Sequence, residues 1–136
     1  MTSAGLVTIR SNHGPEETMN RFEMEVSRRG MMVFARIDHA AGAAAAGLPL
    51  RPTDLLIFGS PNAGTPLMTS VQTMGVDLPL KALVWRDSSG ATWLSYNDPR
   101  WIAKRHGLGQ EADPTANTMA GVLDALVKAA IRPAKE

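Results

Sequence analysis

The sequence predicts an α+β fold, a mainly antiparallel sheet of about five strands with its helices on one face. Three observations favour it. Short β-prone segments do not alternate strictly with full crossover helices, which a parallel α/β sheet would need. Two of these segments flank residues 87–90, a polar turn ending in glycine and typical of a hairpin. The chain then closes with an amphipathic stretch that predicts one long helix.

The first elements follow from local signals. Residues 6–9 are β-prone and predict the first strand. Pro15 suits the first turn of a helix, whose apolar residues recur at spacings of three and four. Gly30 marks the end of that helix, and residues 32–37 predict the second strand.

The middle of the chain predicts two short helices around a buried strand. Asp38 can cap an Ala-rich helix that ends at Gly47. Residues 55–58 are a continuous apolar run, which predicts a central strand buried on both faces. Thr65 and the proline after it predict the start of a helix of about two turns toward Met74.

The last third predicts a hairpin and two helices. Residues 81–86 and 91–96 form the two arms of the hairpin. Asp98 and the following proline open a short helix that ends near His106. Asp113 opens the long final helix, which carries the cleanest apolar stripe in the chain.

Length and composition narrow the classes of function. The chain has 136 residues, a net charge of +1 and no cysteine. Domains cluster at about 100–150 residues, so we expect one domain over residues 1–136, with a polar tail from Pro133. Disulfides and thiolate metal sites are excluded. A charge this close to neutral lacks the basic face typical of nucleic-acid binding.

The sequence shows no signal for export or membrane insertion. The first residues lack the basic and apolar regions of a secretory signal. No apolar stretch approaches the ~18–20 residues of a spanning helix. We therefore expect a cytoplasmic protein with neither nucleic acid nor membrane as a partner.

A series of ordered motifs runs through most of the chain. They are IDHAA (37–41), LRPT (50–53), LLIFGSP (55–61), GTPLM (64–68), DLPLK (77–81), YNDP (96–99) and RH (105–106). Together they resemble the DUF302 family of small bacterial and archaeal proteins, whose function has not been established. The resemblance implies a TATA-binding-protein-like α+β fold of order β-α-β-β-β-β-α, and a homodimer. Ser60 departs from the asparagine common in the family.

Asp38 and His39 are the first candidate site. A carboxylate beside an imidazole can form an acid/base pair near neutral pH. The alternative is that Asp38 only caps the helix that follows while His39 bonds locally.

Residues 59–65 nearly spell a phosphate-binding loop, with two glycines between a strand and a helix. No lysine follows Gly64, so a nucleotide triphosphatase is rejected. The N–H groups at a helix start behind Thr65 could still hold a carboxylate or phosphate. A plain capped turn is the alternative.

The remaining candidates are less specific. Asp98 and His106 bracket one short helix, about 12 Å apart, and favour simple capping roles. Lys81 and Arg51 could clamp an anion, or lie solvated at the surface. No histidine pair has metal-ligand spacing, so a metal site would need His39 and His106 to meet near a carboxylate such as Asp38. The sequence identifies no cofactor.

Four aromatic residues crowd into a short stretch near the hairpin. They are Trp85, Trp93, Tyr96 and Trp101. Trp85 and Trp93 can be cross-strand neighbours. The group could wall an apolar pocket, form a subunit interface or pack beneath the last helix.

Three functional hypotheses remain. We expect a homodimeric module that binds a small molecule, anions included, where the second and third strands meet the loops of Asp38–His39 and Gly64–Thr65, near Lys81 and Tyr96. The second hypothesis is an enzyme with His39 as general acid/base, oriented by Asp38, and Lys81 or Thr65 holding an anion. The third is a structural or partner-binding dimer.

Overall fold

A computed structural model describes residues 3–133 and confirms the α+β prediction. Five strands form one sheet in the order β1-β5-β4-β3-β2, and every neighbouring pair is antiparallel. The strands are β1 (Leu6–Arg10), β2 (Met32–Asp38), β3 (Thr53–Gly59), β4 (Leu80–Arg86) and β5 (Thr92–Asn97). The hairpin predicted around residues 87–90 joins β4 to β5.

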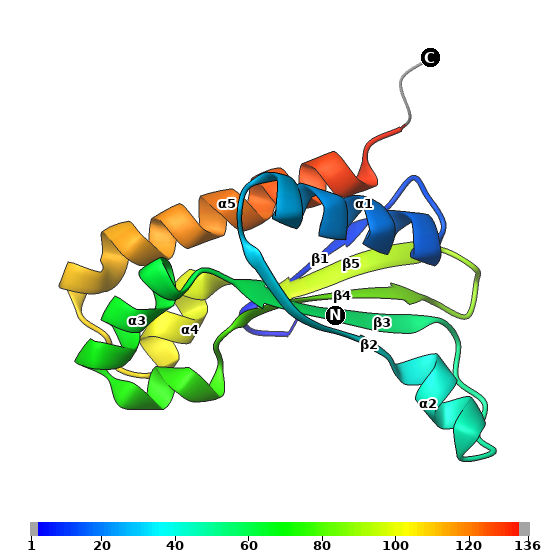
Figure 1. The fold of residues 1–136 in the computed structure, drawn as a ribbon, viewed down its shortest axis with the longest axis horizontal. Helices are drawn as coiled ribbons and strands as arrows, with labels where there is room; N and C mark the ends of the chain where they lie inside the picture. The colour runs from blue at the N-terminus through cyan, green and yellow to red at the C-terminus, as the bar shows by residue number, and fades with distance from the viewer. Residues whose placement is uncertain (1–2, 134–136) are drawn as a thin grey trace.

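The two long helices lie side by side across one face of the sheet (Figure 1). They are α1 (Pro15–Arg28) and α5 (Asp113–Ile131). The short helices are α2 (His39–Ala45), α3 (Pro61–Ser70), α4 (Pro99–Arg105) and the 3-10 turns η1 (Gln72–Val76) and η2 (Gln110–Ala112). Figure 1 shows α3 and α4 at one end of the sheet and α2 at the other. No helix within residues 3–133 is long and apolar enough to cross a membrane.

The core fills the space between the sheet and the long helices. Phe22 on α1 and Phe58 on β3 meet edge to face, with ring centroids 5.3 Å apart. Leu123 and Leu126 cover them from α5 and are fully buried. This is the stripe predicted for the final helix.

The third strand is buried on one face rather than on both. Leu56 and Phe58 are fully buried under the helices, whereas Leu55 and Ile57 on the other face are partly exposed. The strand is an interior one, but β4 holds the centre of the sheet. Both long helices pack on the same face of the sheet, and a continuous apolar run in the sequence does not reveal this arrangement.

Helix α3 begins earlier than predicted, at Pro61 rather than behind Thr65. Ser60 precedes it as the N-cap residue, and the N–H groups of Ala63 and Gly64 both donate to its carbonyl, at 3.0 and 3.1 Å. The sequence offers two prolines that suit a first turn, and the chain uses the first. Pro66 therefore lies inside the helix.

The end of α3 also differs from the prediction. The helix ends at Ser70, and Met74, where we expected it to finish, belongs to the 3-10 turn η1. The other predicted elements are confirmed to within about two residues, the usual uncertainty of helix ends. The tail predicted from Pro133 lies, beyond Pro133 itself, outside the described residues.

Candidate functional site

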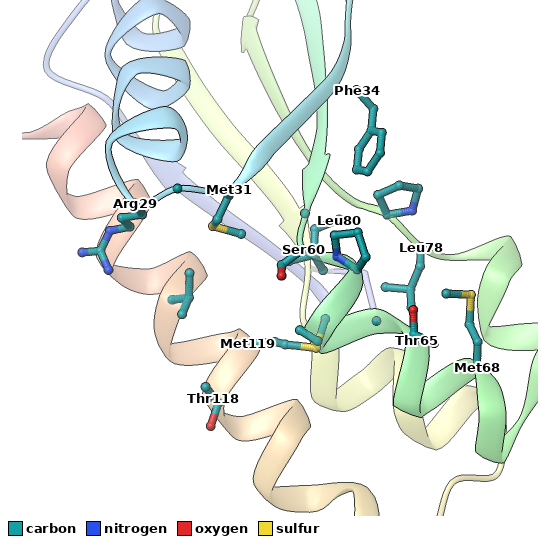
Figure 2. Close-up of a pocket in the computed structure, with 17 residues that line it drawn as sticks. Arg29, Met31, Phe34, Ser60, Thr65, Met68, Leu78, Leu80, Thr118 and Met119 are labelled. Carbon is teal, nitrogen blue, oxygen red and sulfur yellow. The ribbon is translucent and has the colours of Figure 1, made fainter.

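A cavity of about 580 Å³ opens at the end of the sheet where β2 begins and β3 ends. Four parts of the chain form its walls (Figure 2). They are the α1–β2 junction, the β3–α3 junction with the first half of α3, residues 78–80 at the start of β4, and one face of α5. The cavity is thus built from segments far apart in the sequence.

Gly30 and Gly64 are among the residues in the walls of this cavity. Gly30 turns the chain from α1 into β2 with a φ of 74°, a conformation that favours glycine. A Cβ on Gly64 would lie 3.6 Å from Leu78, in van der Waals contact, so α3 packs closely against the segment before β4.

The lining is mostly apolar and rich in methionine. Its larger apolar side chains include Met31, Phe34, Met68, Leu78, Leu80 and Met119, and Val122 lies beside them. Methionine is flexible and polarizable, so such a wall can adapt to more than one ligand shape. A space of this size and character suits an organic molecule.

A few polar groups lie among the apolar ones. Ser60, Thr65 and Thr118 contribute hydroxyls. Arg29 is at the rim, with its guanidinium pointing away from the other labelled side chains (Figure 2). Its Nε lies 3.9 Å from Glu25, a loose ion pair at the surface.

The structure does not bring the predicted pocket residues together. Gly64 and Thr65 line the cavity. Asp38 pairs with Asp54 at the far end of β3, whereas Met32 pairs with Gly59 beside the cavity. The intervening stretch of strand spans about 17 Å. Consecutive antiparallel strands place the end of one beside the start of the next, so these two loops lie at opposite ends.

Asp38 and His39 are placed by α2. The carboxylate of Asp38 accepts the N–H of Ala41 at 2.9 Å, which is the predicted cap. His39 is exposed in the first turn. A catalytic role for His39 stays a prediction. Arg51 is near this end too, and its Nε donates to the carbonyl of Arg86 at 3.3 Å.

Lys81 and Tyr96 are on opposite faces of the sheet. Lys81 pairs in register with Ile57 on the face away from the long helices. Tyr96 belongs to the core and is 8% exposed, and burial raises the pKa of its hydroxyl.

Asp98 caps α4, as the sequence predicted, because its carboxylate accepts the N–H of Arg100 at 2.9 Å. The hydrogen bond from the Arg100 side chain lowers the pKa of Asp98.

His106 has two side-chain partners that the sequence did not reveal. Its Nε2 lies 2.6 Å from Asp77 Oδ2, and its Nδ1 lies 2.9 Å from Thr73 Oγ1. Arg105 also binds Asp77, at 2.8 Å. Burial acts to raise the pKa of Asp77, but the bond from His106 and the charge of Arg105 bring it below its ordinary value.

A shared metal ion is not supported. Within residues 3–133, no three His, Asp or Glu side chains are grouped to hold one. His39 begins α2 and His106 follows α4, at opposite ends of the sheet (Figure 1).

The aromatic group divides among several places. Trp85 and Trp93 are cross-strand neighbours as predicted, with rings stacked 6.2 Å apart. Their N–H groups donate to Ser95 at 2.9 Å and to Asp87 at 2.8 Å. Trp101 packs on α4. In the described part of the chain, the cavity lining includes none of the four aromatic residues, so they do not wall it.

Comparison with known families settles the resemblance. The sequence model of the family described as "Domain of unknown function DUF302" matches residues 7–126 of the chain. The chain belongs to the DUF302 family. A crystal structure of an uncharacterized conserved DUF302 protein from Bacillus stearothermophilus has a TM-score of 0.83 and 19% identity, covering 96% of this chain and all of that one. At this identity the likeness establishes the fold alone.

Closer DUF302 relatives carry a different name. The fluoride-specific ion channel FluC 1 of Brucella suis is 50% identical over 116 residues, which is 85% of this chain and 46% of that protein. The fluoride-specific ion channel FluC 2 of Brucella melitensis matches equally over 43% of its length. The chain thus spans less than half the length of these relatives.

Proposed function

We propose that this DUF302 domain binds a small organic molecule in the cavity between β2, α3 and α5. The cavity itself carries the proposal, because its volume of about 580 Å³ lies within the range of ligand pockets. The cavity is already present in the structure without a ligand.

The lining favours an amphipathic ligand. Met31, Met68 and Met119 offer a wide apolar surface, and Ser60 and Thr65 offer hydroxyls for one polar group. The anionic ligand considered from the sequence relied on a helix start behind Thr65 and on Lys81 or Arg51. Helix α3 begins instead at Pro61, and the cavity lining, over the residues that the structure describes, includes neither of these two cations. An apolar body with a single hydrogen-bonding group fits these walls better.

We further propose that the domain works as a homodimer, as the family resemblance implies. Support comes from β2, an edge strand of the sheet. Met32, Phe34 and Ile37 on this strand are 39–52% exposed, and an open strand edge with apolar side chains is suited to pairing with another copy. The TATA-binding-protein-like classification belongs to the same family-based proposal.

A neutral fluorescent probe tests the cavity. N-phenyl-1-naphthylamine should bind the wild-type protein and become brighter. Val122→Trp fills the cavity and should weaken binding at least tenfold. Val76→Trp is the matched control, since Val76 is 73% exposed on η1. Equal binding by both variants would contradict the cavity as the site.

Native mass spectrometry tests the assembly and any retained ligand. A dimer with a defined extra mass supports both parts of the proposal. A dimer without added mass and without probe binding favours a structural or partner-binding dimer, and a monomer contradicts the homodimer.

A second candidate function comes from the Brucella relatives, which are named as fluoride-specific channels. The 50% identity supports the proposal that this domain is associated with such a channel. If so, sodium fluoride should change the affinity of the probe or the melting temperature of the domain, whereas sodium chloride at equal ionic strength should not. Identical responses to both salts count against a direct effect of fluoride.

A further inference from the structure

Three side chains outside the cavity form a continuous chain of hydrogen bonds. Asp77 binds Nε2 of His106 at 2.6 Å, and Nδ1 of His106 faces the hydroxyl of Thr73 at 2.9 Å. Asp77 follows η1, Thr73 belongs to η1, and His106 is the C-cap of α4. In the described part of the chain, none of the three lines the cavity.

For a neutral His106, the bonding pattern assigns the roles of the two ring nitrogens. Asp77 carries a lowered pKa and is a carboxylate at neutral pH, so it accepts a hydrogen bond and donates none. The proton of a neutral His106 therefore resides on Nε2. Nδ1 then presents its lone pair to the hydroxyl of Thr73, which is the relation of a base to the group it activates.

The imidazole of His106 is largely buried, whereas the hydroxyl that it faces is on an exposed residue. The side chains of His106 and Asp77 are 10% and 14% exposed, so the imidazole is held in place. Thr73 is exposed on the surface turn and open to a reactant. Arg105 is bound to the same carboxylate and 52% exposed, which places a cation beside the relay.

We propose that Thr73 is a nucleophile for acyl transfer, with His106 as its general base, Asp77 as a positioning residue and a small activated ester as the class of substrate. Thr73 Oγ1 forms a bond to the acyl carbon while its proton passes to His106 Nδ1. The bond from that carbon to the leaving oxygen breaks, and the leaving group takes the proton from His106. Water then hydrolyses the acyl-threonine.

The same bonds could serve only to tether η1 to α4, and chemistry separates the two roles. A tether predicts lower stability on mutation but no reaction with an ester. A relay predicts an acyl adduct on one particular threonine.

The experiment uses p-nitrophenyl acetate with the whole protein. We expect release of p-nitrophenolate and an acetyl group mapped by peptide mass spectrometry to Thr73. Thr73→Val and His106→Gln should each lower the rate at least tenfold, whereas Thr73→Ser should retain it. Thr69→Val is the matched control, because that exposed hydroxyl on α3 donates to the carbonyl of Thr65 at 2.9 Å.

Asp77 is tested by rescue. Asp77→Asn should lower the rate about as much as His106→Gln, and Asp77→Glu should recover part of it, while circular dichroism confirms that each variant is folded. No adduct on Thr73 in wild-type samples quenched with acid during the first turnover overturns the proposal. So does a Thr73→Val rate within twofold of Thr69→Val, or a mapped adduct elsewhere.

Discussion

The indole of Trp101 packs directly on the backbone of Gly5, so that a Cβ at Gly5 would lie 2.2 Å from Trp101 Cδ2. Gly5 also has a φ of +73°, which L-residues with side chains rarely adopt. It precedes β1, and its carbonyl accepts the N–H of Asp98 at 2.8 Å. The contact fixes the start of β1 against α4.

Gly5→Ala should therefore destabilise the protein by more than conformational strain alone. Gly47 supplies the control, since its φ is +76° and a Cβ there would meet no atom within 4 Å. We expect Gly47→Ala to cost about 1–2 kcal/mol and Gly5→Ala clearly more, measured by urea unfolding. Equal losses would show that Trp101 moves aside without cost.

The edge-to-face pair of Phe22 and Phe58 should show measurable coupling. Both rings are fully buried, so each single change to leucine lowers the free energy of unfolding. In a double-mutant cycle we expect an interaction of about 0.5–1.5 kcal/mol. Additive losses would indicate that the two rings contribute by burial alone.

The carboxylate of Asp87 should make the hairpin sensitive to acid. The indole N–H of Trp93, then the groups of Ser89 and Ala91, hold the pKa of Asp87 well below its ordinary value of 3.8. Because the folded-state pKa is lowered, the carboxylate stabilises the folded protein at pH values above its ordinary pKa of 3.8. This stability is lost as the pH falls from 3.8 toward the folded-state pKa. The melting-temperature gap between wild type and Asp87→Asn should shrink from pH 7 to pH 3.

Trp93→Phe tests the cause of this effect. It removes the indole N–H, the largest contributor to the lowered pKa of Asp87. In that background, Asp87→Asn should cost less and depend less on pH. A gap that is constant between pH 7 and pH 3 in the wild-type background would contradict the assignment.

Asp38 should contribute to local stability through its cap. Asp38→Ala removes the acceptor for the Ala41 N–H and should cost about 0.5–2 kcal/mol, with faster hydrogen exchange confined to α2. Asp38→Asn keeps an acceptor and should cost less. Because α2 is remote from the cavity, neither change should alter probe affinity. A large loss of affinity would return Asp38 to the binding site.

Local signals predicted the helices and strands well where one residue decides the outcome. Asp38 and Asp98 cap the helices that they were expected to cap. The hairpin was predicted from its turn, which ends in Gly90 with a φ of 91°. The start of α3 was misplaced because Pro61 and Pro66 give the same local signal, and the helix begins at Pro61.

The sites depend on long-range proximity that a single sequence does not encode locally. Asp77 and His106 are 29 residues apart, and no spacing rule relates them to Thr73. The DLPLK motif contains Asp77 and the RH motif contains His106, and these two motifs were the available hints. The cavity likewise joins α5 to the β3–α3 junction, and this contact follows from the choice of sheet face by α5.

The position of β1 at the edge of the sheet also bears on how the chain is assembled. Leu6 pairs with Asn97, so within residues 3–133 strand β1 acquires its one sheet neighbour after some ninety further residues. A ribosome therefore releases β2, β3 and β4 in an order that lets each meet its partner promptly, while β1 waits for β5. The entropic cost of closing this loop grows only slowly with its length, but it precedes the contacts that offset it, so we expect β1 to dock late in folding.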